Sequence, residues 1–384
     1  MSGAVYDVVV AGLGAMGSAA AYHLAARGLR ILGLDAHTPG HARGSSHGET
    51  RIIRLSYFEH PSYVPLLRRA YALWRELEQR AHADLLRLTG GLYLGPPGSE
   101  LVSGSRLSAE QHGLDHEVLD AAQVRRQFPQ FHAAPETVAL WEPDAGFLLP
   151  ERCIAAHLRL AATHGASLHY DRPLLSWRPT GSGVEVATPA GTYHAARLVL
   201  TTGAWLDRFV PGEAAQRLAL RVERNVPFWL RPAEQPAAFT PDRFPIFIWD
   251  TPGGHFYGVP HVERPGVKVA RHHTDQFGDP DLIDRTPHAA DEVPVRAFVQ
   301  THMPGLDGPV EHSEVCLYTL TPDGHFVVDA HPDCPQVVFA SACSGHGFKF
   351  SSVVGELLAD LATTGRTDTA AEFLRLGRLA PRRG

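Results

Sequence analysis

The N-terminal part of the chain combines apolar runs, a glycine-rich turn and a helical pattern. Residues 5–10 (VYDVVV) form an apolar run that indicates a buried parallel strand. The glycines of AGLGAMG at 11–17 come next, followed by a helical segment that extends to Arg27 and ends at Gly28. A second apolar run, LRILGLD at 29–35, indicates another strand. This order predicts a strand–turn–helix–strand unit of an α/β domain.

Helical periodicity recurs later in the chain. Residues 61–82 place apolar side chains on one face of a helix, with Pro65 near its start. Another helix is predicted to begin near Pro150 and to end at Gly165. Further helices are predicted at residues 291–302 and at about 349–363.

Short apolar runs between residues 225 and 275 indicate β-structure of a different kind. VPFWL, PIFIWD, HFYGVP and VKVARHH suggest an antiparallel sheet distinct from the parallel one. Upstream, a hairpin leads into a buried strand at Leu198–Thr202. The predicted fold class is α/β, with a Rossmann-like nucleotide-binding domain made of discontinuous segments and an antiparallel substrate domain inserted into it. The expected ranges are 1–88, 145–220 and 318–384 for the first domain and 89–144 and 221–317 for the second.

The composition is that of an ordinary globular chain. Of its 384 residues 44% are apolar and 20% charged, and the net charge of −6 argues against nucleic acid and anionic membranes as partners. No apolar run reaches the roughly 18 residues of a membrane span, and the N-terminus lacks the basic region of a signal peptide. The four cysteines form no C-x-x-C pair, so we expect a reducing compartment, the cytoplasm. The 23 histidines show no ligand spacing, so no metal is predicted.

The glycines near the N-terminus predict a dinucleotide site. Gly12, Gly14 and Gly17 fit G-x-G-x-x-G, in which they allow a tight turn, a close approach to a pyrophosphate and close helix packing. The helix N-terminus then faces the phosphates. Asp35, at the end of the second strand, can accept a ribose hydroxyl and would repel a 2′-phosphate, which disfavours NADP. The motif does not separate NAD from FAD, and its alternative is a glycine-rich turn of an unrelated α/β domain.

Three segments carry a resemblance to a known family. GSSHGETRIIR at 44–54, CLYTLTPDGHFVVD at 316–329 and SGHGFKF at 344–350 resemble, in order and at matching distances, signatures of the monomeric sarcosine oxidase and N-methyltryptophan oxidase family of FAD-dependent amine oxidases. The likeness covers nearly the whole chain. It implies an FAD-binding domain of the glutathione-reductase type and oxidation of N-methyl amino acids.

The resemblance places Cys316 at the position of the family's flavin-linking cysteine. FAD would then be held covalently, through a thioether formed when the thiolate adds to the flavin 8α-methyl carbon. Such a thiolate needs nearby cations that lower its pKa. His47 and Arg51 match family residues near the flavin and could supply that charge. Without the matching context, a lone cysteine in an apolar run would be interpreted as a buried small hydrophobe, as the other three cysteines are.

Two cations are assigned to a substrate carboxylate. Arg54 and Lys349 match the family's carboxylate-binding pair, and a guanidinium with an ammonium can fix a carboxylate in one orientation. The alternative is two surface cations. Lys349 is expected to open a helix, where its charge opposes the helix dipole and needs an anion or a functional reason. Tyr257 and Phe256 are candidates for the pocket wall, although aromatic residues in strands are more often core.

Lys268 in GVKVARHH matches the family lysine that activates oxygen beside the flavin. Its positive charge would stabilise superoxide as electron transfer begins. The alternative is the solvent face of a strand, since the segment alternates. His272 matches a family active-site histidine, and Tyr318 matches a residue near the substrate. Arg51 completes the predicted catalytic set.

Further positions follow the resemblance. The cofactor-binding positions that it adds are Ser45, His47, Thr50, Thr319, Gly345, Gly347, Phe348 and Lys349. The chain also departs from the family. Ser46 replaces one of two paired histidines and Glu49 replaces an aspartate, which puts little in doubt. Arg271 and Ile248 stand where a tyrosine and a flexible methionine are common, which leaves the substrate side chain open.

The expected activity is oxidative demethylation of an N-methyl α-amino acid. A hydride equivalent would pass from the N-methyl group to the flavin, the iminium would hydrolyse to formaldehyde and a primary amino acid, and oxygen would reoxidise the flavin to give hydrogen peroxide. The alternatives are an N-methyltryptophan oxidase or another secondary amine oxidase, for pipecolate or glycated amines. A flavin dehydrogenase and a non-catalytic dinucleotide-binding protein also remain. The expected partners are a small substrate and O2, with the chain a monomer or weak homo-oligomer.

Overall fold

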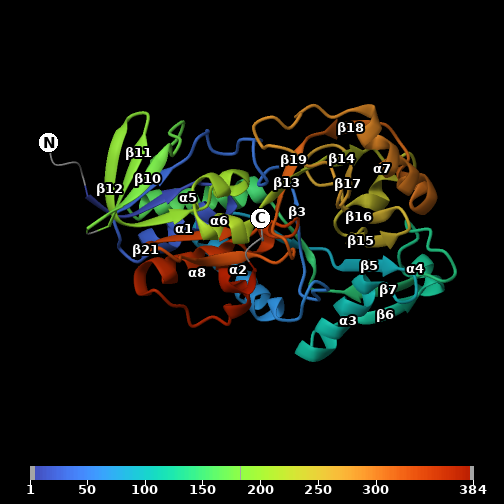
Figure 1. The fold of residues 1–384 in the computed structure, drawn as a ribbon. Coiled ribbons are helices and arrows are strands. Elements are labelled where there is room, and N and C mark those ends of the chain that lie inside the picture. Colours follow the sequence, from blue (N-terminus) through green and yellow to red (C-terminus); the bar gives the residue numbers. More distant parts are fainter. Residues whose placement is uncertain (1–4, 182, 381–384) are drawn as a thin grey trace.

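Two eight-stranded sheets form the two halves of the structure, a computed structural model that describes residues 5–181 and 183–380 (Figure 1). In the first sheet, five strands run parallel in the order β9–β2–β1–β12–β21. β10, β11 and β20 add antiparallel pairs at one side. The strands of this sheet are β1 (Val5–Ala11), β2 (Ile31–Leu34), β9 (Ser167–His169), β10 (Ser176–Thr180), β11 (Gly183–Thr188), β12 (Gly191–Leu200), β20 (Val327–His331) and β21 (Cys334–Ser341).

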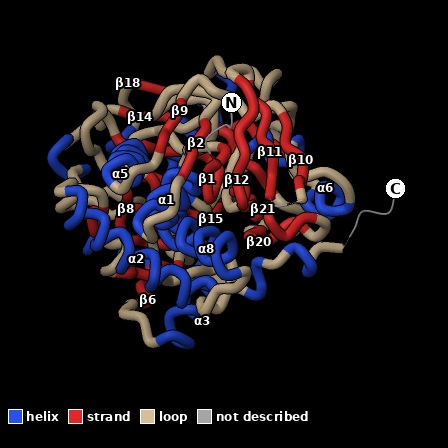
Figure 2. The backbone as a smooth tube through the Cα atoms, turned by 90° about the vertical axis from the view of Figure 1, so that its left-hand side faces the viewer, coloured by secondary structure: helices blue, strands red, loops and turns tan. Residues whose placement is uncertain are grey.

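Helices α1 (Ala15–Ala26), α5 (Pro150–Thr163) and α8 (Ser351–Thr364) pack side by side against this sheet (Figure 2). α1 is rich in alanine and mostly buried, because neighbouring helices and the sheet enclose it. A Cβ on Gly355 of α8 would lie 2.4 Å from the Cβ of Ala19. Small residues on both helices therefore permit the close contact that positions α1 directly after the glycine turn.

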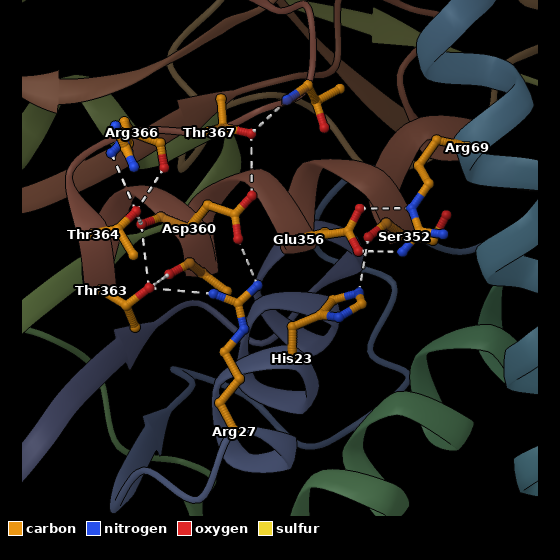
Figure 3. A network of polar contacts seen from close by, with 12 residues as sticks. His23, Arg27, Arg69, Ser352, Glu356, Asp360, Thr363, Thr364, Arg366 and Thr367 are labelled. Carbon is orange, nitrogen blue, oxygen red and sulfur yellow. Dashed lines mark hydrogen bonds and ion pairs between the residues drawn. The ribbon is translucent and has the colours of Figure 1, made fainter.

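A polar network joins α1 and α2 (Tyr63–Ala81) to α8 (Figure 3). Arg27 Nη2 lies 2.6 Å from Asp360 Oδ1, and Arg69 Nε donates to Glu356 Oε2 over 2.8 Å. Both arginines are held by carboxylates of α8, as expected for contacts that fix helix packing.

The second sheet has the order β18–β14–β17–β16–β15–β5–β7–β6. All neighbours are antiparallel except β5 and β15, which run parallel. No hairpin can join a parallel pair, and here the chain leaves β5 and passes through the other half before it returns as β15. The strands are β5 (Gly91–Gly95), β6 (Glu117–Asp120), β7 (Val138–Glu142), β14 (Phe228–Leu230), β15 (Ile246–Thr251), β16 (Gly254–Val259), β17 (Val267–Arg271) and β18 (Val310–Ser313); helices α3 (Glu100–His112), α4 (Ala121–Gln127) and α7 (Ala289–His302) flank them.

Two small sheets carry several residues of the recognised segments. β13 (Arg221–Asn225) pairs with β19 (Cys316–Leu320), and β8 (Gly146–Leu148) pairs with both β3 (Arg51–Ile53) and β4 (Leu86–Leu88). The remaining elements are α6 (Glu213–Leu218) and 3-10 turns at Gly203–Arg208, Pro236–Phe239, Pro304–Leu306, Phe348–Phe350, Glu372–Leu374 and Leu376–Arg378.

The predicted α/β fold class is confirmed, and so are the predicted helices, which correspond to α1, α2, α5, α7 and α8. Lys349 lies in the 3-10 turn directly before α8 rather than in the helix itself. The domain boundaries stay a prediction, and their outermost residues at both chain ends lie outside the described residues. Among the helices of the described part of the chain, none is long and apolar enough to cross a membrane.

Candidate active site

A cavity of about 510 Å³ lies at the carboxyl ends of the parallel strands. Gly12 follows β1, Asp35 follows β2, Thr201 follows β12 and Ala342 follows β21, and all four residues line it. In open α/β sheets this edge is where nucleotides bind. The topology therefore brings the predicted dinucleotide residues to one place.

The three predicted glycines have three different surroundings. Gly12 has φ +89°, and a Cβ there would lie 2.4 Å from the carbonyl oxygen of Thr201. A Cβ on Gly17 would lie 1.7 Å from the carbonyl oxygen of Gly12, so the helix packs against the turn. Gly14 faces the cavity, and a Cβ there would meet only Ser46 Oγ, at 3.5 Å. The turn requires a glycine at position 12 and the helix packing one at position 17, whereas Gly14 leaves room for a ligand.

Asp35 holds the glycine turn in place. Its Oδ2 accepts a hydrogen bond from the Leu13 amide at 2.7 Å, and its Oδ1 accepts one from the His37 amide at 2.9 Å. Its carboxylate lines the cavity. The predicted contact with a ribose hydroxyl stays a prediction.

Buried hydroxyl groups line the first cavity without a protein partner. Thr202 Oγ1, Thr319 Oγ1 and Ser341 Oγ have no hydrogen-bond partner within residues 5–181 and 183–380. Buried polar atoms are nearly always hydrogen-bonded, so this cavity is suited to a polar ligand that supplies the missing bonds. Its size, glycine turn and hydroxyls fit FAD.

A second cavity of about 100 Å³ adjoins the first, since Ser45, Cys343 and Phe348 line both. It brings together predicted residues from distant parts of the sequence. Gly17, His47 and Lys268 line neither cavity and lie behind the walls. Besides Ser45 and Phe348, the predicted residues in the wall of the second cavity are Thr50, Arg51, Arg54, Tyr257, His272, Cys316, Tyr318, Gly345, Gly347 and Lys349.

Cys316 is a buried free thiol in the wall of the second cavity. Arg51 Nη2 donates to its sulfur over 3.4 Å. Burial raises the pKa of the thiol, and the charges of Arg51 and Lys268 counter this only in part. The ring of His47 is hydrogen-bonded to the carbonyl of Val315 instead, and burial lowers its pKa to about 4. Of the two predicted cations, only Arg51 contacts the sulfur.

Arg54 and Lys349 are both buried, so the surface alternative is wrong for them. Arg54 Nη2 lies 2.7 Å and 2.6 Å from the two carboxylate oxygens of Glu59. Lys349 Nζ donates to the carbonyl of His346 over 2.6 Å. Burial lowers the pKa of Lys349 to about 7, assisted by the charge of Arg54 and opposed by that of Glu59. Both cations lie over the ring of Tyr57.

Lys268 is 2% exposed, so the solvent-face alternative is wrong for it as well. Its ammonium donates to the carbonyls of Gly48 at 2.8 Å and Thr50 at 3.0 Å. Burial, assisted by the nearby charge of Arg51, lowers its pKa to about 7. An ammonium near its midpoint at neutral pH is unusual and often functional.

The aromatic wall contains Tyr257, His272 and Tyr318. The rings of His272 and Tyr318 are 5.6 Å apart, and burial lowers the pKa of His272 well below its usual value. A Cβ on Gly345 would lie 2.9 Å from both of these rings, so a glycine is needed there. Of the four departures from the family, Ile248 lines the second cavity and Ser46 lines the first, whereas Arg271 and Glu49 line neither.

Sequence reasoning missed several residues of the second cavity. Glu59 is the partner of Arg54, and the other missed wall residues are Ile52, Phe58, Pro227, His255, Cys343 and His346. One unused signal was available. Among the 35 basic residues the sequence contains lysine only at positions 268 and 349, and both are buried beside the cavities.

A dinucleotide cavity that continues into a small cavity with a buried thiol and buried cations defines a flavin-dependent oxidoreductase. The family model described as FAD dependent oxidoreductase matches residues 7–361, and the chain belongs to this family. The predicted family and the predicted enzyme class are thereby confirmed.

Named relatives agree with this assignment. The monomeric sarcosine oxidase of Streptomyces avermitilis is 45% identical over 366 residues, 94% of each chain. The N-methyl-L-tryptophan oxidase of Salmonella newport is 34% identical over 361 residues, 93% of this chain and 94% of the relative. Among solved structures, NikD, an unusual amino acid oxidase essential for nikkomycin biosynthesis, matches with a TM-score of 0.85 at 26% identity over 97% of both chains.

Proposed function

We propose that this FAD-dependent oxidoreductase is an oxidase of N-methyl α-amino acids. In the overall reaction R–NH–CH₃, O2 and water give R–NH₂, formaldehyde and hydrogen peroxide. The observation that carries the proposal is the presence of two buried cations, Arg54 and Lys349, in the same small cavity as Cys316. The names of the relatives, sarcosine oxidase and N-methyl-L-tryptophan oxidase, support the same substrate class.

Arg54 and Lys349 would bind the substrate carboxylate. Glu59 accepts from Arg54 Nη2 with both of its carboxylate oxygens and so holds the guanidinium in the cavity wall. A substrate carboxylate near Lys349 would raise the pKa of that ammonium, since an opposite charge favours the charged form. Lys349 would thus become fully charged, like Arg54, when the substrate binds.

FAD, when bound, supplies the acceptor for the hydride equivalent, and the residues around Cys316 would hold it. Cys316 would hold FAD through a thioether to the flavin 8α-methyl carbon, a bond whose formation would release the thiol hydrogen and one methyl hydrogen to oxygen as hydrogen peroxide. Arg51, in contact with the sulfur, would stabilise the thiolate. His272 stays uncharged and so adds no positive charge beside the substrate amine.

Lys268 would assist the reaction with oxygen. Its ammonium lies behind the wall formed by Thr50, which lines the second cavity. A positive charge there would stabilise the negative charge that develops on oxygen as it accepts electrons.

The first experiment is acid precipitation of the purified protein. The covalent proposal expects a yellow pellet and a tryptic peptide containing Cys316 that carries the flavin mass, and the Cys316→Ala variant should release any flavin. Free flavin from the unmodified protein would reject the covalent bond but not the family.

A peroxide assay then tests the substrate class. Sarcosine, N-methyltryptophan, pipecolate and a glycated amine are compared, and oxidation of none of them would favour a non-catalytic dinucleotide-binding protein. Peroxide yield in air also separates an oxidase from a dehydrogenase. A cytoplasmic location belongs to this proposal too, because the four cysteines are free thiols throughout the described structure.

A further inference from the structure

Three charged groups converge on the space beside Gly48. A Cβ on this glycine would lie 2.7 Å from Glu314 Oε1, 3.2 Å from Arg51 Nη1 and 3.4 Å from Lys268 Nζ. Gly48 has φ +101°, a conformation that also favours glycine. The chain therefore leaves room at this point for two cations and one carboxylate to face one another.

The two oxygens of Glu314 face different surroundings. Oε2 lies 3.3 Å from Arg264 Nη1 and 3.4 Å from His312 Nε2, both on partly exposed side chains. Oε1 is buried and has no hydrogen-bond partner in the part of the chain that the structure describes. A buried carboxylate oxygen is costly without compensating charge, and here the compensation comes from the cations beside Gly48.

We propose that Glu314 is a positioning residue for the oxygen half-reaction, whose carboxylate keeps the buried ammonium of Lys268 charged. The two hydrogen-bond acceptors of Lys268 are neutral backbone carbonyls, and the nearby guanidinium of Arg51 repels it. Glu314 supplies the larger negative charge and Glu151 a smaller one, and Arg264 and His312 hold the Glu314 carboxylate from the outside. The role in catalysis rests on the proposed function of Lys268.

The charge balance around Lys268 agrees with this assignment. Burial and then the charge of Arg51 lower the pKa of Lys268, Glu314 raises it, and the net result is a pKa of about 7. Burial alone would raise the pKa of Glu314, but its interactions with His47, Arg264 and Lys268 lower it, so the carboxylate stays ionised. The groups that face Lys268 are Arg51 from β3, Glu151 from α5, Trp229 from β14, Cys316 from β19 and Glu314 from the segment before β19.

The lysine content of the chain makes a direct test possible. With lysine only at 268 and 349, a full-length protein labelled with ¹³C at lysine Cε gives two side-chain signals, which Lys268→Met assigns. In Glu314→Gln we expect the titration midpoint of Lys268 to fall by about one pH unit. Lys349 is the internal control, because Arg54 and Glu59 are the charges that act on it. Glu263→Gln is the matched control, since this carboxylate pairs with Arg152 at the surface.

Glu314→Asp keeps a carboxylate and should leave the titration midpoint of Lys268 closer to that of the unmodified protein. This variant separates loss of the charge from a folding defect in the glutamine variant. An unchanged Lys268 midpoint in Glu314→Gln, or an equal fall in Glu263→Gln, would overturn the proposal.

The kinetic arm follows flavin reoxidation by oxygen after chemical reduction with dithionite, so it needs no amine substrate. Its pH profile should move to lower pH in Glu314→Gln by the same amount as the Lys268 midpoint. If the midpoint falls and the reoxidation profile stays in place, Glu314 has no role with oxygen and the proposal fails. If both move but no N-methyl amino acid is oxidised, the proposed substrate class fails and the role of Glu314 stands.

Discussion

The molecule contains two clusters of cations that differ in residue type and in partners. In the polar network of α1, α2 and α8 (Figure 3), the Arg27 and Arg69 side chains are 34% and 41% exposed and pair with carboxylates. Beside the second cavity, Lys268 and Lys349 are 2% and 4% exposed and donate to backbone carbonyls. One cluster holds helices together, and the other borders the candidate active site.

The difference teaches what lysine contributes in this chain. A guanidinium stays protonated under all ordinary conditions, whereas a buried ammonium shifts its pKa readily. Burial lowers the pKa of both lysine side chains to about 7, so each can be charged or neutral near neutral pH. All the others of the 35 lysine and arginine residues are arginines. Lysine therefore occurs only where a compact, titratable cation lies beside the cavities.

The largest expected effect is that of Lys268→Met on the reaction with oxygen. Removing one preorganised charge from a buried site typically costs about 10²–10³-fold in rate. We expect a loss of that size in flavin reoxidation measured by stopped flow, with anaerobic flavin reduction by substrate changed much less. Lys268→Arg sharpens the comparison, because it keeps a charge but not the compact shape. Reoxidation as fast as in the unmodified protein would remove Lys268 from the oxygen reaction.

A smaller effect is expected when Lys349 is replaced by methionine. A charge-assisted hydrogen bond contributes about 1.5–3 kcal/mol, so the KM for an N-methyl amino acid should rise by roughly 10- to 150-fold. Arg54 remains to orient the carboxylate, so kcat should fall less. Binding of an amine without a carboxylate is the control and should be unaffected. Equal losses for both ligands would mean that Lys349 acts on the fold and not on the carboxylate.

The pKa of Lys349 predicts a more gradual effect of pH. The ammonium is charged below about pH 7 and loses its proton as the pH rises through that value in the free protein. Affinity for a carboxylate inhibitor should therefore fall above about pH 7, by at most about tenfold per pH unit for one titrating group. Spectral titration of the bound flavin measures this affinity. The slope should vanish in Lys349→Met; a slope that persists there must come from another group.

The nucleotide half was largely predictable from local sequence. Gly12, Gly14, Gly17 and Asp35 lie within 24 residues of one another, and the turn, helix and strand that they define are set by local steric rules. Most of the predicted site residues from the three segments that resemble the family also lie around one cavity. The positions of these residues follow from the sequence because motif and element coincide along the chain, and their roles stay predictions.

The charge partners were not predictable in this way. Arg54 binds Glu59, and Lys268 is faced by Glu314, a residue 46 positions away on another element. The approach of Glu314 to Lys268 depends on how strands pair across the fold, whereas Arg54 and Glu59 meet within the irregular segment after β3, which has no regular spacing that would signal the pair. The alternation around Lys268 was also misleading as an exposure signal, because β17 lies inside the second sheet with β14 and β16 beside it and is buried on both faces. In an antiparallel strand that is covered on both faces, the alternation of polar and apolar residues no longer indicates which side chains are exposed to solvent.

The smallest effect is expected in the arginine network, where Arg69→Lys keeps the charge but loses the two-pronged contact with Glu356. Because the pair is partly exposed, we expect a loss of only about 0.2–1 kcal/mol in the free energy of unfolding, measured with urea. Flavin reoxidation and the KM for substrate should stay unchanged, since the network touches neither cavity wall described above. The same exchange of arginine for lysine at Arg54 is the counterpart and should raise KM. If Arg69→Lys slowed the reaction instead, the two cation clusters would not be functionally separate.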